Sequence, residues 1–166
     1  MICNFTKLLS EQAATRFEVQ VIGDGLSDHA FAEKVKQENG DFVKNGVVKF
    51  LGRRSDIKEC LQKIDLIVVP SRQDPLPTVI IEAFLSGVPV LGTPVGGIPE
   101  MISLGKNGFI CSQVKDFVSK AFLLLEDKEL WERFSAEARK TAEEKFSATV
   151  MQRRLLDLYC KAKAQY

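Results

Sequence analysis

The chain has 166 residues, 45% of them hydrophobic and 27% charged, which suits one domain with a substantial core. Its 23 basic and 22 acidic residues leave a formal net charge of +1, so bulk electrostatics favours neither nucleic acid nor an anionic membrane surface as a partner. The longest apolar runs are far shorter than the roughly 20 residues of a membrane-spanning helix, and no signal-peptide pattern follows Met1. We therefore expect a cytoplasmic protein that forms a single domain over residues 1–166.

The cysteines and the histidine give no sign of a metal site. Cys3, Cys60, Cys111 and Cys160 are widely spaced with no close pair, which favours reduced, mostly buried thiols over a disulfide framework or a zinc site. The only histidine, His29, lies within a helical pattern, so we expect it to act as neither base nor ligand. The chain also has no Asp-x-Asp pattern of the kind that holds a divalent ion.

The amino-terminal two thirds of the chain alternates between short apolar runs and segments of helical period. The apolar runs predict strands at residues 17–23, 47–52, 66–70 and 89–93. Apolar positions spaced by three and four predict helices at residues 27–39, 55–64 and 78–87. Because several of the strands are almost continuously apolar, we expect a parallel sheet covered by helices on both faces. The predicted fold is therefore α/β, a doubly wound, Rossmann-like sheet that binds ligands at the carboxyl ends of its strands.

From Val114 onward the pattern predicts helices alone, at residues 114–127, 128–146 and 147–166. Trp131 and Phe134 have the spacing of a stripe that faces the core. The domain is thus expected to end in a series of carboxyl-terminal helices.

Small and polar residues follow each predicted strand, in the segments 23–25, 52–56, 70–74 and 93–100. In a doubly wound sheet these loops share one edge, where free backbone amides and helix N-termini suit a nucleoside diphosphate. The Gly-Asp-Gly of the first loop is equally typical of a plain tight turn. It is not a full dinucleotide fingerprint, and this weakens the alternative of a nicotinamide-dependent dehydrogenase.

Asp74 and Glu82 are the most informative pair of charged residues. If Pro77 lies in the first turn of the following helix, Asp74 comes just before its N-terminus and Glu82 between one and two turns in. Two carboxylates so placed can hold different hydroxyls of one extended ligand, while its negative part is faced by the amides of Leu76, Thr78 and Val79. The spacing alone is also explained by an acidic residue near a helix start and a surface glutamate.

The stretch DPLPTVIIEAFLSGVPVLGTPVGGIPEMI, with VIGDG and FLGRRSDI before it and NGFI after it, resembles a known family. It is similar to the carboxyl-terminal, donor-binding domain of retaining GT-B glycosyltransferases, family 4 in particular, from about Phe17 to Glu126. The resemblance implies a UDP-, GDP- or ADP-sugar as substrate and retaining transfer to a glycan or lipid-linked acceptor, as in polysaccharide biosynthesis. It implies no cofactor and no metal.

The same resemblance implies roles for individual residues. Glu82 would hold the ribose hydroxyls of the nucleotide. Asp74 stands where the family usually has a glutamate that touches the transferred sugar, and it is the candidate catalytic residue. The backbone of Leu76, Pro77 and Thr78 would lie beside the sugar and diphosphate, although a proline supplies no amide.

Glycines would shape the remainder of the site. Gly23 and Gly25 would let the nucleotide approach closely, and the base would lie near the backbone of Arg53. Gly96 and Gly97 would form a turn packed beneath the site.

One departure from the family concerns the start of the sequence. The family's donor domain usually opens with a strand ending in Gly-Arg and then a Lys-Gly pair, whereas residues 1–20 resemble only the helix that follows. We therefore expect the first strand and the acceptor-binding amino-terminal domain to lie outside these residues. Through that domain the protein would reach the inner face of the membrane. The alternative is a non-catalytic nucleotide-sugar-binding or interaction module.

Overall fold

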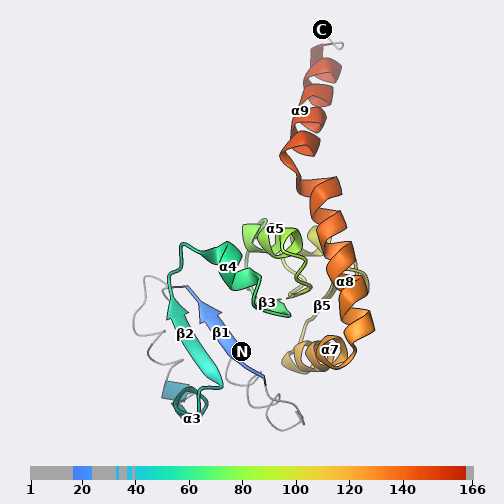
Figure 1. The fold of residues 1–166 in the computed structure, drawn as a ribbon. Coiled ribbons are helices and arrows are strands. Elements are labelled where there is room, and N and C mark those ends of the chain that lie inside the picture. Colours follow the sequence, from blue (N-terminus) through green and yellow to red (C-terminus); the bar gives the residue numbers. More distant parts are fainter. Residues whose placement is uncertain (1–16, 24–32, 34–36, 39, 164–166) are drawn as a thin grey trace.

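The computed structural model describes residues 17–23, 33, 37–38 and 40–163 (Figure 1). The strands are β1 (Val19–Ile22), β2 (Val48–Gly52), β3 (Ile67–Val69), β4 (Val90–Gly92) and β5 (Gly108–Ile110). The α-helices are α3 (Gly40–Lys44), α4 (Ile57–Leu61), α5 (Thr78–Leu85), α6 (Ile98–Met101), α7 (Val114–Glu126), α8 (Lys128–Thr141) and α9 (Ala148–Lys163), with a π-helix η1 (Ala142–Phe146) between the last two.

All strand pairs are parallel, as predicted, but the strands form two sheets instead of one. β1 pairs with β2, while β3, β4 and β5 form a second sheet with β4 in the centre. Within the described part of the chain, β1 and β3 are not hydrogen-bonded to each other. The sheet that the sequence predicts as continuous is therefore divided between β1 and β3.

Helices cover both faces of the three-stranded sheet, which confirms the doubly wound architecture. In β4, Val90 packs with the core residues of α5 on one face, and the next residue, Leu91, packs with those of α7 on the other. The alternation follows from the two-residue period of a strand. Ile80 and Phe84 of α5 and Phe117 of α7 are completely buried in these two layers.

Three short elements were not predicted: α3, α6 and β5. The strand β5 has only three residues and begins with Gly108, so its apolar signal is too short to read. Its glycine has a packing reason, since a Cβ there would lie 2.1 Å from the carbonyl oxygen of Val90 in β4. The predicted helix over residues 27–39 falls mostly outside the described residues.

The carboxyl-terminal helices occur where they were predicted. Asp127 caps α8 by accepting a hydrogen bond from the Leu130 amide at 2.9 Å. Phe134 is buried as expected, whereas Trp131 is only half-buried and donates its indole N–H to the carbonyl oxygen of Asp65 at 2.6 Å. Helix α9 extends away from the sheets and has no buried residue (Figure 1).

The thiols fit the structural role that was predicted, with one exception. Cys60 and Cys111 are buried and free, and burial raises the pKa of the Cys111 thiol to about 11, so it stays protonated at neutral pH. Cys160 on α9 is exposed, which corrects the expectation for that residue. Cys3 and His29 lie outside the described residues. None of the described helices combines the length and apolarity needed to cross a membrane.

Candidate functional site

The loop between β3 and α5 carries most of the predicted site residues. Pro77 is the N-cap residue of α5, with φ −67° and ψ 110°, so it lies just before the first turn and not within it as predicted. Its carbonyl oxygen accepts a hydrogen bond from the Ile80 amide at 3.1 Å, and its ring is buried. A proline side chain cannot cap a helix, so the amide of Thr78 at the start of α5 receives no side-chain cap from it.

The turn after β4 packs directly against this loop, as predicted for Gly96 and Gly97. A Cβ on Gly96 would lie 1.7 Å from the carbonyl oxygen of Asp74, and one on Gly97 would lie 2.3 Å from that of Pro75. The Gly97 amide also donates a hydrogen bond to the backbone carbonyl oxygen of Asp74 at 3.4 Å. Only residues without a side chain permit this approach, so the two glycines set the path of the backbone around Asp74.

Thr93 adds a second connection between the ends of β3 and β4, which the sequence did not reveal. Its buried hydroxyl donates to the carbonyl oxygen of Ser71 at 2.6 Å across a separation of 22 residues. Its amide donates to the carbonyl oxygen of Val69 at 3.3 Å. The loop that contains Asp74 is therefore held in place by both the side chain of Thr93 and the turn at Gly96 and Gly97.

Asp74 and Glu82 flank the N-terminal half of α5, as their spacing predicted. Asp74 is half-buried in the loop, and Glu82 is exposed on the helix. The opposite face of α5 is fixed in the core by Ile80 and Phe84, which leaves Glu82 on the free face. Leu76, which precedes the helix, is 49% exposed.

Two other predicted residues lie at the ends of β1 and β2. The Gly23 amide donates to the carbonyl oxygen of Gly52 at 2.8 Å, and Arg53 follows as an exposed residue. Gly25 lies outside the described residues. Ile22 and Glu82 line the same cavity, so the end of β1 and helix α5 both border it.

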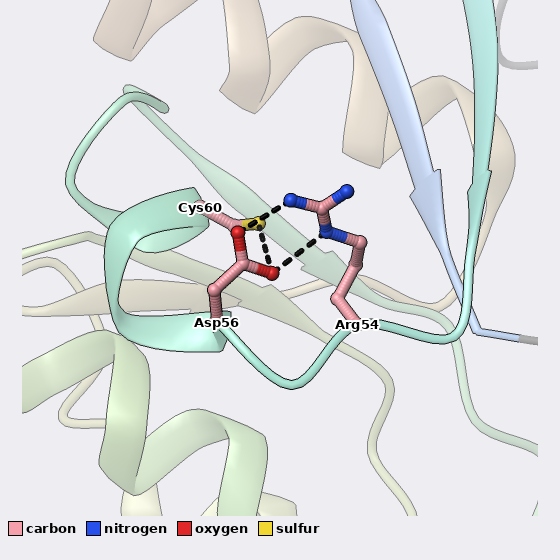
Figure 2. A network of polar contacts seen from close by, with 3 residues as sticks. All are labelled: Arg54, Asp56 and Cys60. Atoms are coloured by element: carbon pink, nitrogen blue, oxygen red, sulfur yellow. Dashed lines mark hydrogen bonds and ion pairs between the residues drawn. The ribbon is translucent and has the colours of Figure 1, made fainter.

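The loop after β2 contains an ion pair that the sequence analysis did not identify (Figure 2). The Nε of Arg54 donates to Oδ1 of Asp56 at 2.7 Å, and its Nη2 contacts Oδ2 of the same carboxylate. This hydrogen-bonded pairing raises the pKa of Arg54 and lowers that of Asp56. Because Asp56 is the N-cap residue of α4, the pair ties the segment after Arg53 to the helix start, and it leaves Arg53 as the neighbouring cation outside the pair.

Among the residues that the structure describes, no three His, Cys, Asp or Glu side chains are grouped closely enough to hold a metal ion. The charged groups in the loops after β2 and β3 are individual carboxylates and arginines, and the N-terminus of α5 adds a partial positive charge.

Residues 1–127 match the family model for glycosyl transferases group 1. The chain is 32% identical over 144 residues to the N-acetyl-alpha-D-glucosaminyl L-malate synthase of Bacillus anthracis, an alignment that covers 86% of this chain and 36% of that protein. The chain thus spans little more than a third of the length of that relative.

Solved structures show the same fold. HepE of Anabaena, determined in complex with UDP, superposes with a TM-score of 0.85 at 23% identity over 95% of this chain and 44% of that one. HepE was also determined with UDP-glucose. The carboxyl-terminal domain of a group 1 glycosyl transferase, LpcC of Francisella tularensis, superposes with a TM-score of 0.78 at 18% identity over 89% of this chain and 78% of that one. The architecture is that of the carboxyl-terminal half of a GT-B enzyme.

Proposed function

Because the chain belongs to the family of group 1 glycosyl transferases, we propose that it binds a nucleoside-diphosphate sugar for retaining transfer to a glycan or lipid-linked acceptor. The binding site would be the edge where β1 to β4 end. The observation that carries this proposal is the close packing of Gly96 and Gly97 on the backbone of Asp74 and Pro75, which fixes the loop ahead of α5. The UDP and UDP-glucose complexes of HepE support this class of ligand.

The two carboxylates would divide the donor between them. Glu82, on the free face of α5, would accept hydrogen bonds from the ribose hydroxyls. Asp74, in the braced loop before the helix, would contact the transferred sugar and act as the candidate catalytic residue. Leu76, Pro77 and Thr78 would border the diphosphate with their backbone.

The diphosphate would be stabilised without a metal ion. The N-terminus of α5 has partial positive charge and uncapped amides, which suits a phosphate group. The base would lie by Gly23 and Arg53, at the ends of β1 and β2. The acceptor would be bound by a further domain.

Replacing Glu82 with glutamine is expected to weaken UDP binding by about 1–3 kcal/mol, because the substitution removes the charge that strengthens its hydrogen bonds to ribose. Isothermal titration of the purified chain with UDP measures the change. Glu126→Gln, at the end of α7, removes the same charge far along the chain and should leave the affinity unchanged. A Glu82→Gln chain that is folded and binds UDP as tightly as the parent would contradict the ribose assignment.

Replacing Asp74 with asparagine is expected to weaken binding of UDP-glucose while leaving binding of UDP almost unchanged. Asparagine keeps the backbone carbonyl that contacts Gly96 and Gly97, so the loop should keep its path. The loss of charge would then act only on the sugar, at a cost of about 1–3 kcal/mol. Titrations of one variant with both ligands provide the comparison, and equal losses for the two would refute this division of roles.

A further inference from the structure

Thr93 is one of three buried residues with a polar side chain in the described part of the chain, and it is the one that contacts the candidate site. Asn107 and Thr141 bond to each other, with Nδ2 of Asn107 donating to the Thr141 hydroxyl at 3.0 Å. The Thr93 hydroxyl instead donates to the carbonyl oxygen of Ser71, in the loop that leads to Asp74. Because buried polar groups need partners, this bond keeps the Ser71 carbonyl beside Thr93.

The Thr93 hydroxyl replaces a hydrogen bond that the backbone no longer makes. In the parallel ladder of β3 and β4, every second residue of β4 donates its amide to β3, and Thr93 continues this series by donating to the carbonyl oxygen of Val69 at 3.3 Å. The next donor in the series would be Val95, to the carbonyl of Ser71. The Val95 amide donates to the carbonyl oxygen of Thr93 at 2.9 Å instead, because the chain turns away after β4. The side chain of Thr93 therefore supplies the donor that the ladder no longer provides to Ser71.

The bond to Ser71 and the glycine turn hold Asp74 from two sides. Only two residues separate Ser71 from Asp74, whose own carbonyl oxygen accepts a hydrogen bond from the Gly97 amide at 3.4 Å. Two fixed carbonyls so close in sequence leave the backbone between them little conformational freedom. Thr93 takes part in both contacts, since its hydroxyl binds Ser71 and its carbonyl accepts the Val95 amide at the start of the turn that carries Gly97.

Glu82 is held independently of Thr93. It lies on α5, whose opposite face is anchored in the core by Ile80 and other buried residues. The backbone just before α5 is fixed by the buried Pro77, whose carbonyl oxygen accepts the Ile80 amide at 3.1 Å. Loss of the Thr93 hydroxyl should therefore release Asp74 on its amino-terminal side and leave Glu82 and the start of α5 in place.

We propose that Thr93 is a positioning residue for the sugar of the donor: through Ser71, its hydroxyl holds Asp74 where the carboxylate meets the transferred sugar. The inference rests on the proposed function, in which Asp74 contacts the sugar and Glu82 contacts the ribose. Thr93 is itself buried, so it acts through Asp74 and not by contact with the donor. Its hydroxyl therefore supports recognition of the sugar and has little effect on binding of the nucleotide.

Replacing Thr93 with valine tests the proposal, because valine removes the hydroxyl and keeps the shape of the side chain. Calorimetric titration is expected to show UDP-glucose binding weakened about tenfold and UDP binding changed by less than about twofold. The matched control Thr93→Ser keeps the hydroxyl and should bind both ligands within about threefold of the parent chain. If the methyl group of valine prevents folding, Thr93→Ala removes the hydroxyl and puts no group in its place. Urea denaturation of all three variants establishes which of them fold.

The same substitution in an Asp74→Asn chain distinguishes positioning from a general loss of structure. If Thr93 acts through the Asp74 carboxylate, Thr93→Val should weaken UDP-glucose binding by no more than about a further twofold in that chain. If Thr93 only stabilises the loop, the two losses should add, and Thr93→Val should cost about tenfold in both chains.

Amide hydrogen exchange without any ligand tests the loop separately from the proposed function. Thr93→Val is expected to speed exchange of the Gly97 amide about threefold or more, because the acceptor of this amide is the Asp74 carbonyl. Exchange of the Ser86 amide, which donates to the carbonyl oxygen of Glu82 at 3.1 Å, should stay the same.

Four results would overturn the proposal, and they differ in what else they contradict. Equal losses of UDP and UDP-glucose affinity, additive losses with Asp74→Asn, or an unchanged Gly97 amide would each show that Thr93 does not place Asp74 for the sugar. A parent chain that binds neither ligand would contradict the proposed function as well, whatever the exchange of the Gly97 amide shows about the loop.

Discussion

Replacing Gly96 with alanine is expected to lower the free energy of unfolding by about 3 kcal/mol and to weaken UDP binding about tenfold or more. A Cβ at this position would lie 1.7 Å from the carbonyl oxygen of Asp74, far inside van der Waals contact. Because the obstacle is backbone, it cannot rotate away as a flexible side chain can. Either the loop before α5 or the turn after β4 has to move, and the candidate site lies on that loop.

The backbone conformation of Gly96 also contributes, and a matched variant separates the two effects. Gly96 has φ +52° and Gly105 has φ +75°, but a Cβ on Gly105 would meet nothing within 4 Å. Gly105→Ala should therefore show only the conformational cost of about 1 kcal/mol and normal UDP binding. Urea denaturation and calorimetric titration of both variants measure the difference. Equal losses of stability would mean that the contact with Asp74 does not fix the loop.

The packing of the Gly96 turn against the loop that contains Asp74 was predicted only from the resemblance to a known family. Residue patterns reveal the strand before Asp74 and the strand before Gly96, because each is a short apolar run. The contact between the two loops depends on the pairing of β3 with β4, which brings together residues that are distant along the chain. Thr93 and its bond to Ser71 were missed for the same reason, since an isolated threonine after a strand carries no signal of its partner.

The limits of the fold prediction have a similar cause. Alternation of apolar runs and helical segments correctly predicts parallel strands with helices on both faces. It cannot show that β1 and β3 are not hydrogen-bonded to each other in the described residues, because the apolar sequence of a buried strand does not reveal which strands lie beside it. The short strand β5, with a glycine and two apolar residues, gives too little pattern to recognise.

The candidate site was predictable where it is local and unpredictable where it joins two elements. The interval between Asp74 and Glu82 places both beside the start of α5, and the structure agrees. That Ile22 and Glu82 line one cavity depends on how the two sheets lie together. The pairing of Arg54 with Asp56 depends on the turn at the start of α4, which the sequence does not specify.

Replacing Phe84 with alanine is expected to have the largest effect on stability, a loss of about 3–5 kcal/mol in the free energy of unfolding. Its side chain is completely buried in the core cluster that α5 shares with β3, β4, α6 and α8, so truncation removes apolar contact and leaves a cavity that neighbouring residues fill only in part. The next residue, Leu85, is 51% exposed, and Leu85→Ala should change stability by only about 0.5 kcal/mol or less.

Comparing these two neighbours tests how the site is held. If α5 is anchored by its buried face, only Phe84→Ala should shift the urea midpoint strongly, and UDP should raise that midpoint again in proportion to its binding. Both variants keep Glu82 and the loop before α5. A Phe84→Ala chain that remains folded should therefore still bind UDP, and its affinity should fall if the truncation loosens α5. Equal shifts of the urea midpoint from the two substitutions would contradict the idea that the buried face of α5 anchors the helix and so orients Glu82 toward the cavity.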